Sequence, residues 1–199
     1  MRKFDIRKLK VRQVSVDQLN DKMLLVNLYA TQAITFIIGL LWVILQGRNA
    51  INLFAIPHGL EFLYGGLGLA AAVVLIDVSV SRWVPEDAME DGGVNDRLFR
   101  ARPVWHIAVI AAVVSICEEL LFRGAVQHAF GPYWTSILFA AIHVRYLRHW
   151  VPTGMVFGIS YGLGWLMDWS GTIWAPILTH FLVDLIMGLI IRFRREEQS

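Results

Sequence analysis

Two adjacent glutamates and an arginine interrupt an apolar run that extends from Val104 to about Phe130. They are Glu118, Glu119 and Arg123, and the run is longer than the roughly 20 residues with which a helix crosses a bilayer. A charged side chain at the centre of a membrane costs roughly 2.5–3.5 kcal/mol on insertion scales. Three such side chains in so short a stretch predict a functional site, which the other apolar segments enclose.

The composition is that of a membrane protein. Of the 199 residues, 56% are hydrophobic and only 17% are charged, against about 25% in a soluble domain. The net charge of +2 gives no indication of a nucleic-acid partner. The single cysteine, Cys117, excludes an intrachain disulfide. We therefore predict an all-α, polytopic membrane helix bundle, located in the cell membrane as a multi-pass protein and surrounded by membrane lipid.

The predicted domain organisation is one membrane-embedded domain between two polar tails. Residues 1–22 carry seven Lys and Arg, which is typical of a cytoplasmic tail, and residues 194–199 form a second cytoplasmic tail. The domain spans residues 23–193, and its motif core spans 104–193. Its six apolar segments are Met23–Gln46, Leu60–Val80, Val104–Phe130, Tyr133–Leu147, Trp150–Trp169 and Thr172–Phe193.

The charges between these segments support about six transmembrane helices. If the N-terminus is cytoplasmic, the joins predicted to lie outside carry a single arginine, Arg48. The inner joins and the C-terminal tail carry many more arginines, as the positive-inside rule predicts. The inner stretch 81–103 also holds several acidic residues. An amphipathic approach to the third apolar segment is one interpretation of it, and we favour a solvated linker.

Ionisable side chains on three of the apolar segments are predicted to lie at similar depths. On a rise of about 1.5 Å per residue, Glu118 and His143 lie roughly 18 and 15 Å from the outer ends of their segments. His180 and Asp184 lie roughly 12 and 18 Å from the outer end of theirs. Because polar residues at membrane depth face a bundle interior or a cavity and mark function, the four are expected to share one site.

Helical spacing separates the roles of these residues. Glu119 and Arg123 are four residues apart, so they share a helix face and are predicted to form a structural ion pair. Glu118 points about 100° away from Glu119 and lacks that partner, which leaves it able to act as a base. His180 and Asp184 are also four apart, so the carboxylate can fix the tautomer of the imidazole.

Three motifs together resemble the CPBP family, that is, the type II CAAX prenyl endopeptidases and their bacterial relatives, also called the abortive-infection family and often labelled metalloproteases. They cover about 75 residues, and residues 1–100 carry no part of the resemblance. Phe139 belongs to the second motif and can border an imidazole. The motifs are Glu118-Glu119-x-x-x-Arg123, Phe139-x-x-x-His143 and His180-x-x-x-Asp184.

The resemblance implies an intramembrane endopeptidase that acts on a peptide or protein substrate, lipidated or membrane-bound. It implies that Glu118 is the base and His143 its partner in activating a water. His180 would stabilise the oxyanion, and Asp184 would orient His180. The last position is Asn in the eukaryotic enzymes, and an ionised Asp cannot donate to an oxyanion, so we expect an orienting role for Asp184.

The need for a metal cofactor stays open at this point. Glu118, His143 and His180 are the residues that could hold Zn²⁺ with a water in the open position. The chain has no His-Glu-x-x-His helix, and a Glu/His pair can activate water without a metal. We expect that none is required.

Three alternatives compete with this interpretation. A proton-coupled transporter would use the same buried acids as a relay, although the chain shows no halves with matching breaks. A non-catalytic membrane binding or immunity protein would need none of the four polar residues. A rhomboid-like protease would use Ser160, which lies in a Gly-x-Ser-x-Gly match. Because Gly154, Gly158 and Gly162 recur every four residues, we interpret that match as a close-packing ridge.

Overall fold

The computed structural model describes residues 20–85, 88 and 93–194, and every regular element within them is a helix. The all-α prediction is therefore confirmed. The predicted tails lie outside the described residues except for residues 20–22 and 194, and their cytoplasmic location stays a prediction. In chain order the elements are α1 (Asp21–Leu45), α2 (Ala50–Leu53), α3 (Glu61–Trp83), α4 (Val94–Phe99), α5 (Val104–Glu119), the π-helical segment η4 (Leu120–Val126), α6 (Gln127–Ile142), α7 (Trp150–Ser170) and α8 (Trp174–Phe193).

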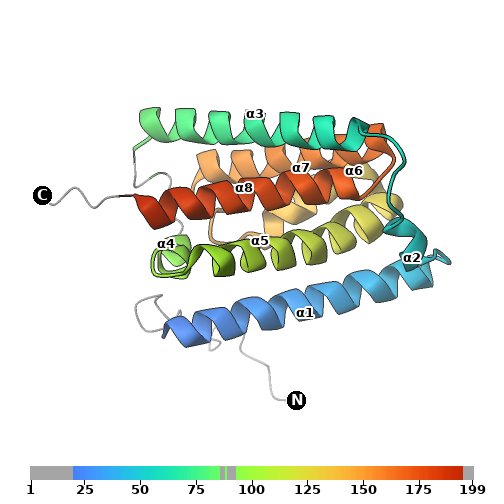
Figure 1. The fold of residues 1–199 in the computed structure, drawn as a ribbon, viewed down its shortest axis with the longest axis horizontal. Coiled ribbons are helices and arrows are strands. Elements are labelled where there is room, and N and C mark those ends of the chain that lie inside the picture. Colours follow the sequence, from blue (N-terminus) through green and yellow to red (C-terminus); the bar gives the residue numbers. More distant parts are fainter. Residues whose placement is uncertain (1–19, 86–87, 89–92, 195–199) are drawn as a thin grey trace, which may run out of the picture.

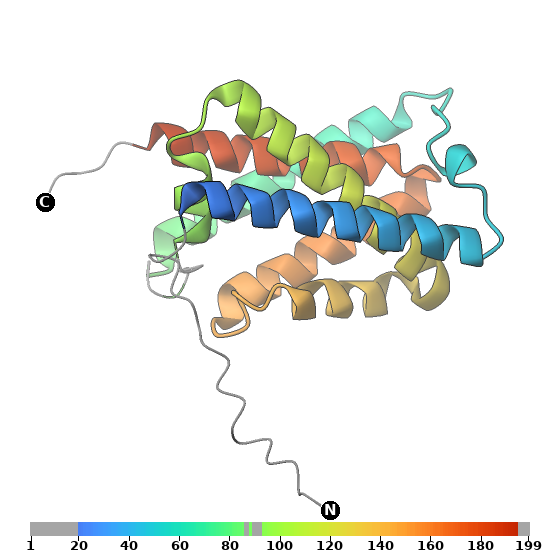
Figure 2. The same cartoon turned by 90° about the horizontal axis from the view of Figure 1, so that it is seen from below.

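The long helices lie side by side in a bundle (Figure 1). α5 and α8 run through its middle, between α1 on one side and α3 on the other. α6 and α7 form a further layer, which is seen below α1 in Figure 2. α1 begins and α8 ends at the same end of the bundle, where α4 also lies, and we call it the α4 end.

Four segments of the described residues are long and apolar enough to cross a membrane: α1, α3, the run Val104–Ile142 and α8. Their outward faces expose large apolar side chains such as Leu45 and Trp83, which are 84% and 87% exposed. Such surfaces are suited to lipid rather than water. The chain is thus a membrane protein. The number of six crossings stays a prediction, because α7 is not one of these four segments and the second half of α6 is not a separate one.

A sharp turn divides the run Val104–Ile142 where the sequence predicted a boundary between two segments. Gly131 has φ 76° and ψ 170°, a conformation that residues with a Cβ rarely adopt, and Pro132 follows it. The chain turns back at this point, so the second half of α6 lies beside α7 (Figure 2). The turn brings His143 at the end of α6 back toward the middle of the bundle.

The prediction of a solvated linker at 81–103 is wrong for residues 93–100. These residues form α4 and its end, and Leu98 and Phe99 are buried in a cluster with Ile107 and Ile110 of α5. Burying two large apolar side chains contributes roughly 1.5–3 kcal/mol each. The charges of this stretch suggested solvent exposure, but the two apolar residues among them anchor α4 to the bundle.

α1 packs closely against η4. At Gly39, an added Cβ would lie 3.0 Å from the backbone N and Cα of Leu121, so a larger residue would push the two backbones apart. Beyond the end of α1, Gln46 donates a 2.9 Å hydrogen bond to the carbonyl of Ala125, and Arg48 donates to that of Gly124. These contacts fix the π-helical segment, a type of irregularity found frequently at functional sites.

Candidate active site

Glu118 lies near the C-terminal end of α5 and faces α1. Its Oε1 accepts a 2.9 Å hydrogen bond from Nε2 of Gln32, which is only 8% exposed. The side chain of Glu118 is half-buried and borders a cavity described below. The expectation that Glu118 lacks the arginine partner is confirmed, and the neutral amide of Gln32 takes that place.

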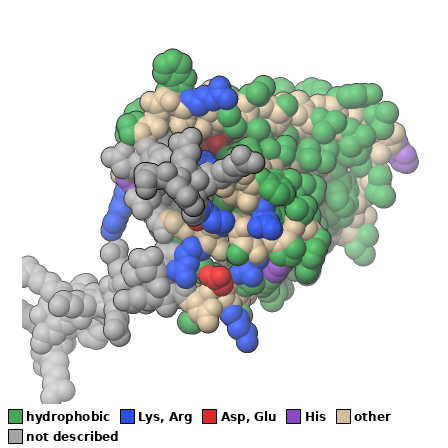
Figure 3. Space-filling model, turned by 60° about the vertical axis from the view of Figure 1, so that its left-hand side comes forward, with side chains coloured by type: hydrophobic (Ala, Val, Ile, Leu, Met, Phe, Trp, Pro, Cys, Tyr) green, Lys and Arg blue, Asp and Glu red, His purple; other side chains and the backbone are tan. Residues whose placement is uncertain are grey.

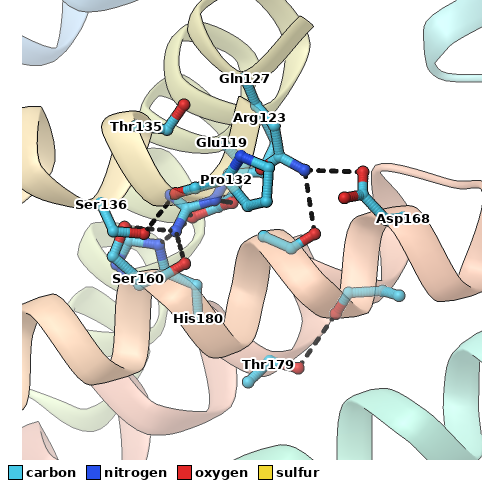
Figure 4. Close-up of polar contacts among 12 residues, drawn as sticks. Glu119, Arg123, Gln127, Pro132, Thr135, Ser136, Ser160, Asp168, Thr179 and His180 are labelled. Carbon is cyan, nitrogen blue, oxygen red and sulfur yellow. Dashed lines mark hydrogen bonds and ion pairs between the residues drawn. The ribbon is translucent and has the colours of Figure 1, made fainter. Parts of the chain in front are cut away.

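Glu119, the next residue of α5, faces α8 and is fully buried. Its Oε1 accepts from Nη1 of Arg123 at 3.1 Å, and its Oε2 lies 3.0 Å from Nε of the same guanidinium. The predicted ion pair is therefore present, at 0% side-chain exposure for both residues. The same Oε1 also lies 2.7 Å from Nδ1 of His180, so Glu119 connects the ion pair to the histidine on α8 (Figure 4).

Arg123 ties this cluster to α7. Its Nη2 donates to both the carbonyl and the hydroxyl of Ser160, at 2.9 and 3.0 Å (Figure 4). Ser160 is only 1% exposed, and its hydroxyl oxygen accepts from a cation. A hydroxyl held in this way is a structural acceptor, and the rhomboid-like interpretation of Ser160 has no support in the geometry.

The close-packing ridge predicted on α7 is wrong at two of its three positions. A Cβ at Gly154 or Gly158 would meet no neighbouring atom, and only Gly162 contacts another helix, through Leu69. The close approach occurs instead at Gly164, where an added Cβ would lie 2.8 Å from Oε1 of Gln127. The regular spacing placed the three glycines on one face, but that face is not the one that packs.

His180 is held between two carboxylates. Its Nδ1 is 2.7 Å from Glu119, and its Nε2 lies 3.6 Å from Oδ2 of Asp184. The second distance is that of an ion pair and is too long for a hydrogen bond. The expected contact between His180 and Asp184 is thus present in a loosened form, and Glu119 is the closer orienting group.

His143 ends α6 and is fixed by its own helix. Its Nδ1 lies 2.6 Å from the carbonyl oxygen of Phe139, which can only accept. Nδ1 therefore carries the hydrogen, and the neutral imidazole has its lone pair on Nε2. The buried ring of Phe139 lies against the imidazole with the centroids 4.5 Å apart, as the motif spacing suggested.

One cavity of about 660 Å³ connects these side chains. Glu118, His143, His180 and Asp184 all line it, together with Gln32 and Phe139. It reaches the α4 end of the bundle, where Asn95, Arg145 and Tyr146 border it. Figure 3 shows that end, with several Lys and Arg side chains around it and apolar side chains over the rest of the visible surface. The structure therefore brings together the four residues that the sequence indicated.

A metal centre is not apparent. Among residues 20–85, 88 and 93–194, no three His, Cys, Asp or Glu side chains are grouped as a metal ion requires. In the set Glu118, His143 and His180, the Nδ1 atom of each histidine is bonded, to Phe139 and to Glu119 respectively, so Nε2 is the nitrogen of each ring that could face an ion. The reaction proposed below uses no metal, and the expectation that none is required stays a prediction.

Two residues of this arrangement were not singled out in the sequence. Gln32 lies outside every motif, and the only signal was an amide in the middle of an apolar helix. Gln127 donates to the carbonyl of Gly164 and to Asp168 on α7, and it follows Arg123 by four residues on the same face. The partners of both residues lie on other helices, at least 37 positions away along the chain, so only the packing shows them.

The fold and the site together define a membrane protein with ionisable groups around an internal cavity, as in a membrane-embedded hydrolase. The family described as type II CAAX prenyl endopeptidase Rce1-like matches residues 100–186. The chain is also 35% identical over 146 residues, 73% of its length and 77% of the relative's, to the uncharacterized protein YpbD of Bacillus subtilis strain 168. No solved structure matches.

The chain belongs to this Rce1-like CPBP family, as the three motifs suggested. The family is one of CAAX-type proteases, and a protease acts on a protein or peptide substrate. The match begins at residue 100, so α1 with Gln32 lies outside it.

Proposed function

We propose that this protein is a multi-pass intramembrane endopeptidase of the cell membrane that hydrolyses a peptide bond in the cavity between α1, α5, α6 and α8. The observation that carries the proposal is that Glu118, His143, His180 and Asp184, from three separate helices, line a single cavity. An apolar bundle that buries several ionisable groups around a cavity incurs a large desolvation cost, which a purely structural role does not explain.

In the proposed reaction Glu118 takes a proton from a water molecule as its oxygen attacks the carbonyl carbon of the scissile bond. The lone pair on Nε2 of His143 accepts a hydrogen bond from the same water and orients it. When the C–N bond breaks, Glu118 returns the proton to the departing amine, so the sum of the two steps is the addition of one water across the peptide bond.

His180 is suited to stabilise the oxyanion that forms. A carboxylate lies near each of its nitrogens, Glu119 near Nδ1 and Asp184 near Nε2. An imidazolium donates from Nδ1 to Glu119, is attracted to Asp184 without a hydrogen bond, and presents its Nε2–H to an approaching oxyanion. The loose 3.6 Å contact to Asp184 leaves room for that approach. Asp184 therefore orients the His180 ring, and His180 stabilises the developing negative charge.

The substrate is proposed to be a peptide or protein segment, lipidated or membrane-bound, that enters from the α4 end. Its identity is open to a direct experiment. Membranes from cells producing the wild type, Glu118→Gln or His143→Ala are compared by quantitative mass spectrometry of protein N-termini, with Glu61→Gln as the control, because Glu61 is exposed on α3 and outside the cavity.

We expect one or more new N-termini that appear with the wild type and with Glu61→Gln and are lost in both site variants. In parallel, a farnesylated CAAX-type peptide with a quenched fluorophore is tested in proteoliposomes, because it is the lipidated substrate class that the family name implies. If Glu118→Gln or His143→Ala retains full cleavage, the assigned roles are refuted. If neither assay detects cleavage by the folded wild type, the endopeptidase proposal fails.

A further inference from the structure

Gln32 is the polar residue of α1 that comes closest to the proposed chemistry. α1 lies wholly outside residues 100–186, which the family description matches, and no motif covers it. Its amide nevertheless donates the 2.9 Å hydrogen bond to Glu118, and its side chain lines the same cavity. A residue in contact with a candidate base affects where that base points.

The direction of this hydrogen bond follows from the chemistry of the partners. An ionised carboxylate only accepts, so Nε2 of Gln32 must be the atom that faces Glu118. The bond occupies Oε1 of Glu118 and leaves Oε2 available to a water in the cavity. Holding one carboxylate oxygen from α1 therefore determines the position of the other.

The remaining atom of the amide adds a cost to this contact, as the same atom does at Gln46 and Gln127. Oε1 of Gln32 is buried and has no hydrogen-bond partner within the described part of the chain. A buried acceptor left unpaired costs about 1–3 kcal/mol, which offsets much of what the bond to Glu118 contributes to stability. An arrangement that is nearly neutral for stability but fixes a catalytic carboxylate is expected of a functional residue.

We propose that Gln32 is a positioning residue of the active site, which holds the Glu118 carboxylate toward the attacking water. This inference rests on the proposed endopeptidase function. It also gives α1 a role beyond enclosing the bundle, because α1 then supplies a polar group that the matched part of the chain lacks.

The test is a kinetic comparison of Gln32→Met with the wild type in proteoliposomes. The probe is a quenched fluorescent peptide spanning the bond that the N-terminal comparison identifies. Methionine keeps the length and apolar packing of the side chain but cannot donate. We expect kcat to fall roughly 10- to 100-fold, as misplacement of a catalytic group by about 1 Å does, with KM changed less than about twofold.

Thr35→Val is the matched control. Thr35 lies three residues beyond Gln32 on the same helix, is half-buried and is not one of the residues that line the cavity. We expect both kcat and KM of this variant within about twofold of the wild type. If it loses kcat as Gln32→Met does, the effect belongs to α1 as a whole and the positioning role is refuted.

Gln32→Asn is a second variant, which keeps the proposal testable if Gln32→Met does not fold. It keeps the amide but is one methylene shorter, so it cannot hold Glu118 in the same place, and we expect kcat to fall at least about fivefold with KM unchanged. If the folded Gln32 variants keep wild-type kcat while Glu118→Gln is inactive, this inference is wrong and the proposed function stands. If Glu118→Gln itself remains active, the proposed function fails, and the positioning role fails with it.

Discussion

Arg123→Met provides the sharpest test of how this site is held together. The Arg123 guanidinium is fully buried and donates to three acceptors on two helices: Glu119 Oε1 and both oxygens of Ser160. Methionine fills a similar volume but donates nothing. The substitution leaves Glu119 as a buried carboxylate with His180 as its remaining partner among the described residues.

The expected magnitude follows from the burial of the pair. Removing one partner of a buried ion pair costs about 3–5 kcal/mol, because the charge that stays behind is uncompensated. Replacing both partners by neutral groups costs much less, so Arg123→Met combined with Glu119→Gln should lose only about 1–2 kcal/mol, since a glutamine can still pair with His180. The difference in the free energy of unfolding between the single and the double variant measures the cost of the uncompensated Glu119 charge.

The measurement is reversible unfolding in mixed micelles with increasing SDS, followed by fluorescence of the eight tryptophans. Arg148→Met is the control, because Arg148 is exposed and its replacement should change the free energy of unfolding by less than about 0.5 kcal/mol. A free energy of unfolding for Arg123→Met within 1 kcal/mol of the wild type would refute the buried-pair reasoning. So would a double variant that is less stable than the single one.

Three further predictions concern the same framework. Ser160→Ala should lose about 1–2 kcal/mol of stability yet keep proteolysis within about threefold, and an inactive but folded protein would restore the serine-protease interpretation. Gly39→Ala should lose about 1–3 kcal/mol in the SDS titration through overpacking, whereas Gly154→Ala should be neutral or stabilising; equal effects would contradict the close approach of α1. Arg48→Met removes the donor to the Gly124 carbonyl and should cost about 1–2 kcal/mol, with unchanged stability as the contrary result.

Membrane class and approximate helix positions could be predicted from the sequence because both depend on local properties. A long apolar run must form a helix in lipid, since its backbone groups have no other partners there. The observed helices at Trp150–Ser170 and Trp174–Phe193 differ from the predicted segments by no more than two residues. The ion pair of Glu119 and Arg123 was equally predictable, because it depends only on a spacing of four residues within one stretch.

Contacts between helices could not be predicted in the same way. Gln32 and Glu118 are 86 residues apart, and Glu119 and His180 are 61 apart, so no local spacing relates them. The packing face of α7 was misjudged for the same reason: a glycine repeat marks a face, but only the neighbouring helices determine whether that face is covered.

The sequence by itself determined that acids and imidazoles would be buried on several apolar helices, because side-chain chemistry and helical period are properties of single segments. Only the tertiary structure decided which of them meet, since that depends on how each helix is rotated and on the turn at Gly131, after which α6 leads to His143 at the cavity. The contact of Gln32 with Glu118 and the contact of Glu119 with His180 both depend on this packing of the helices.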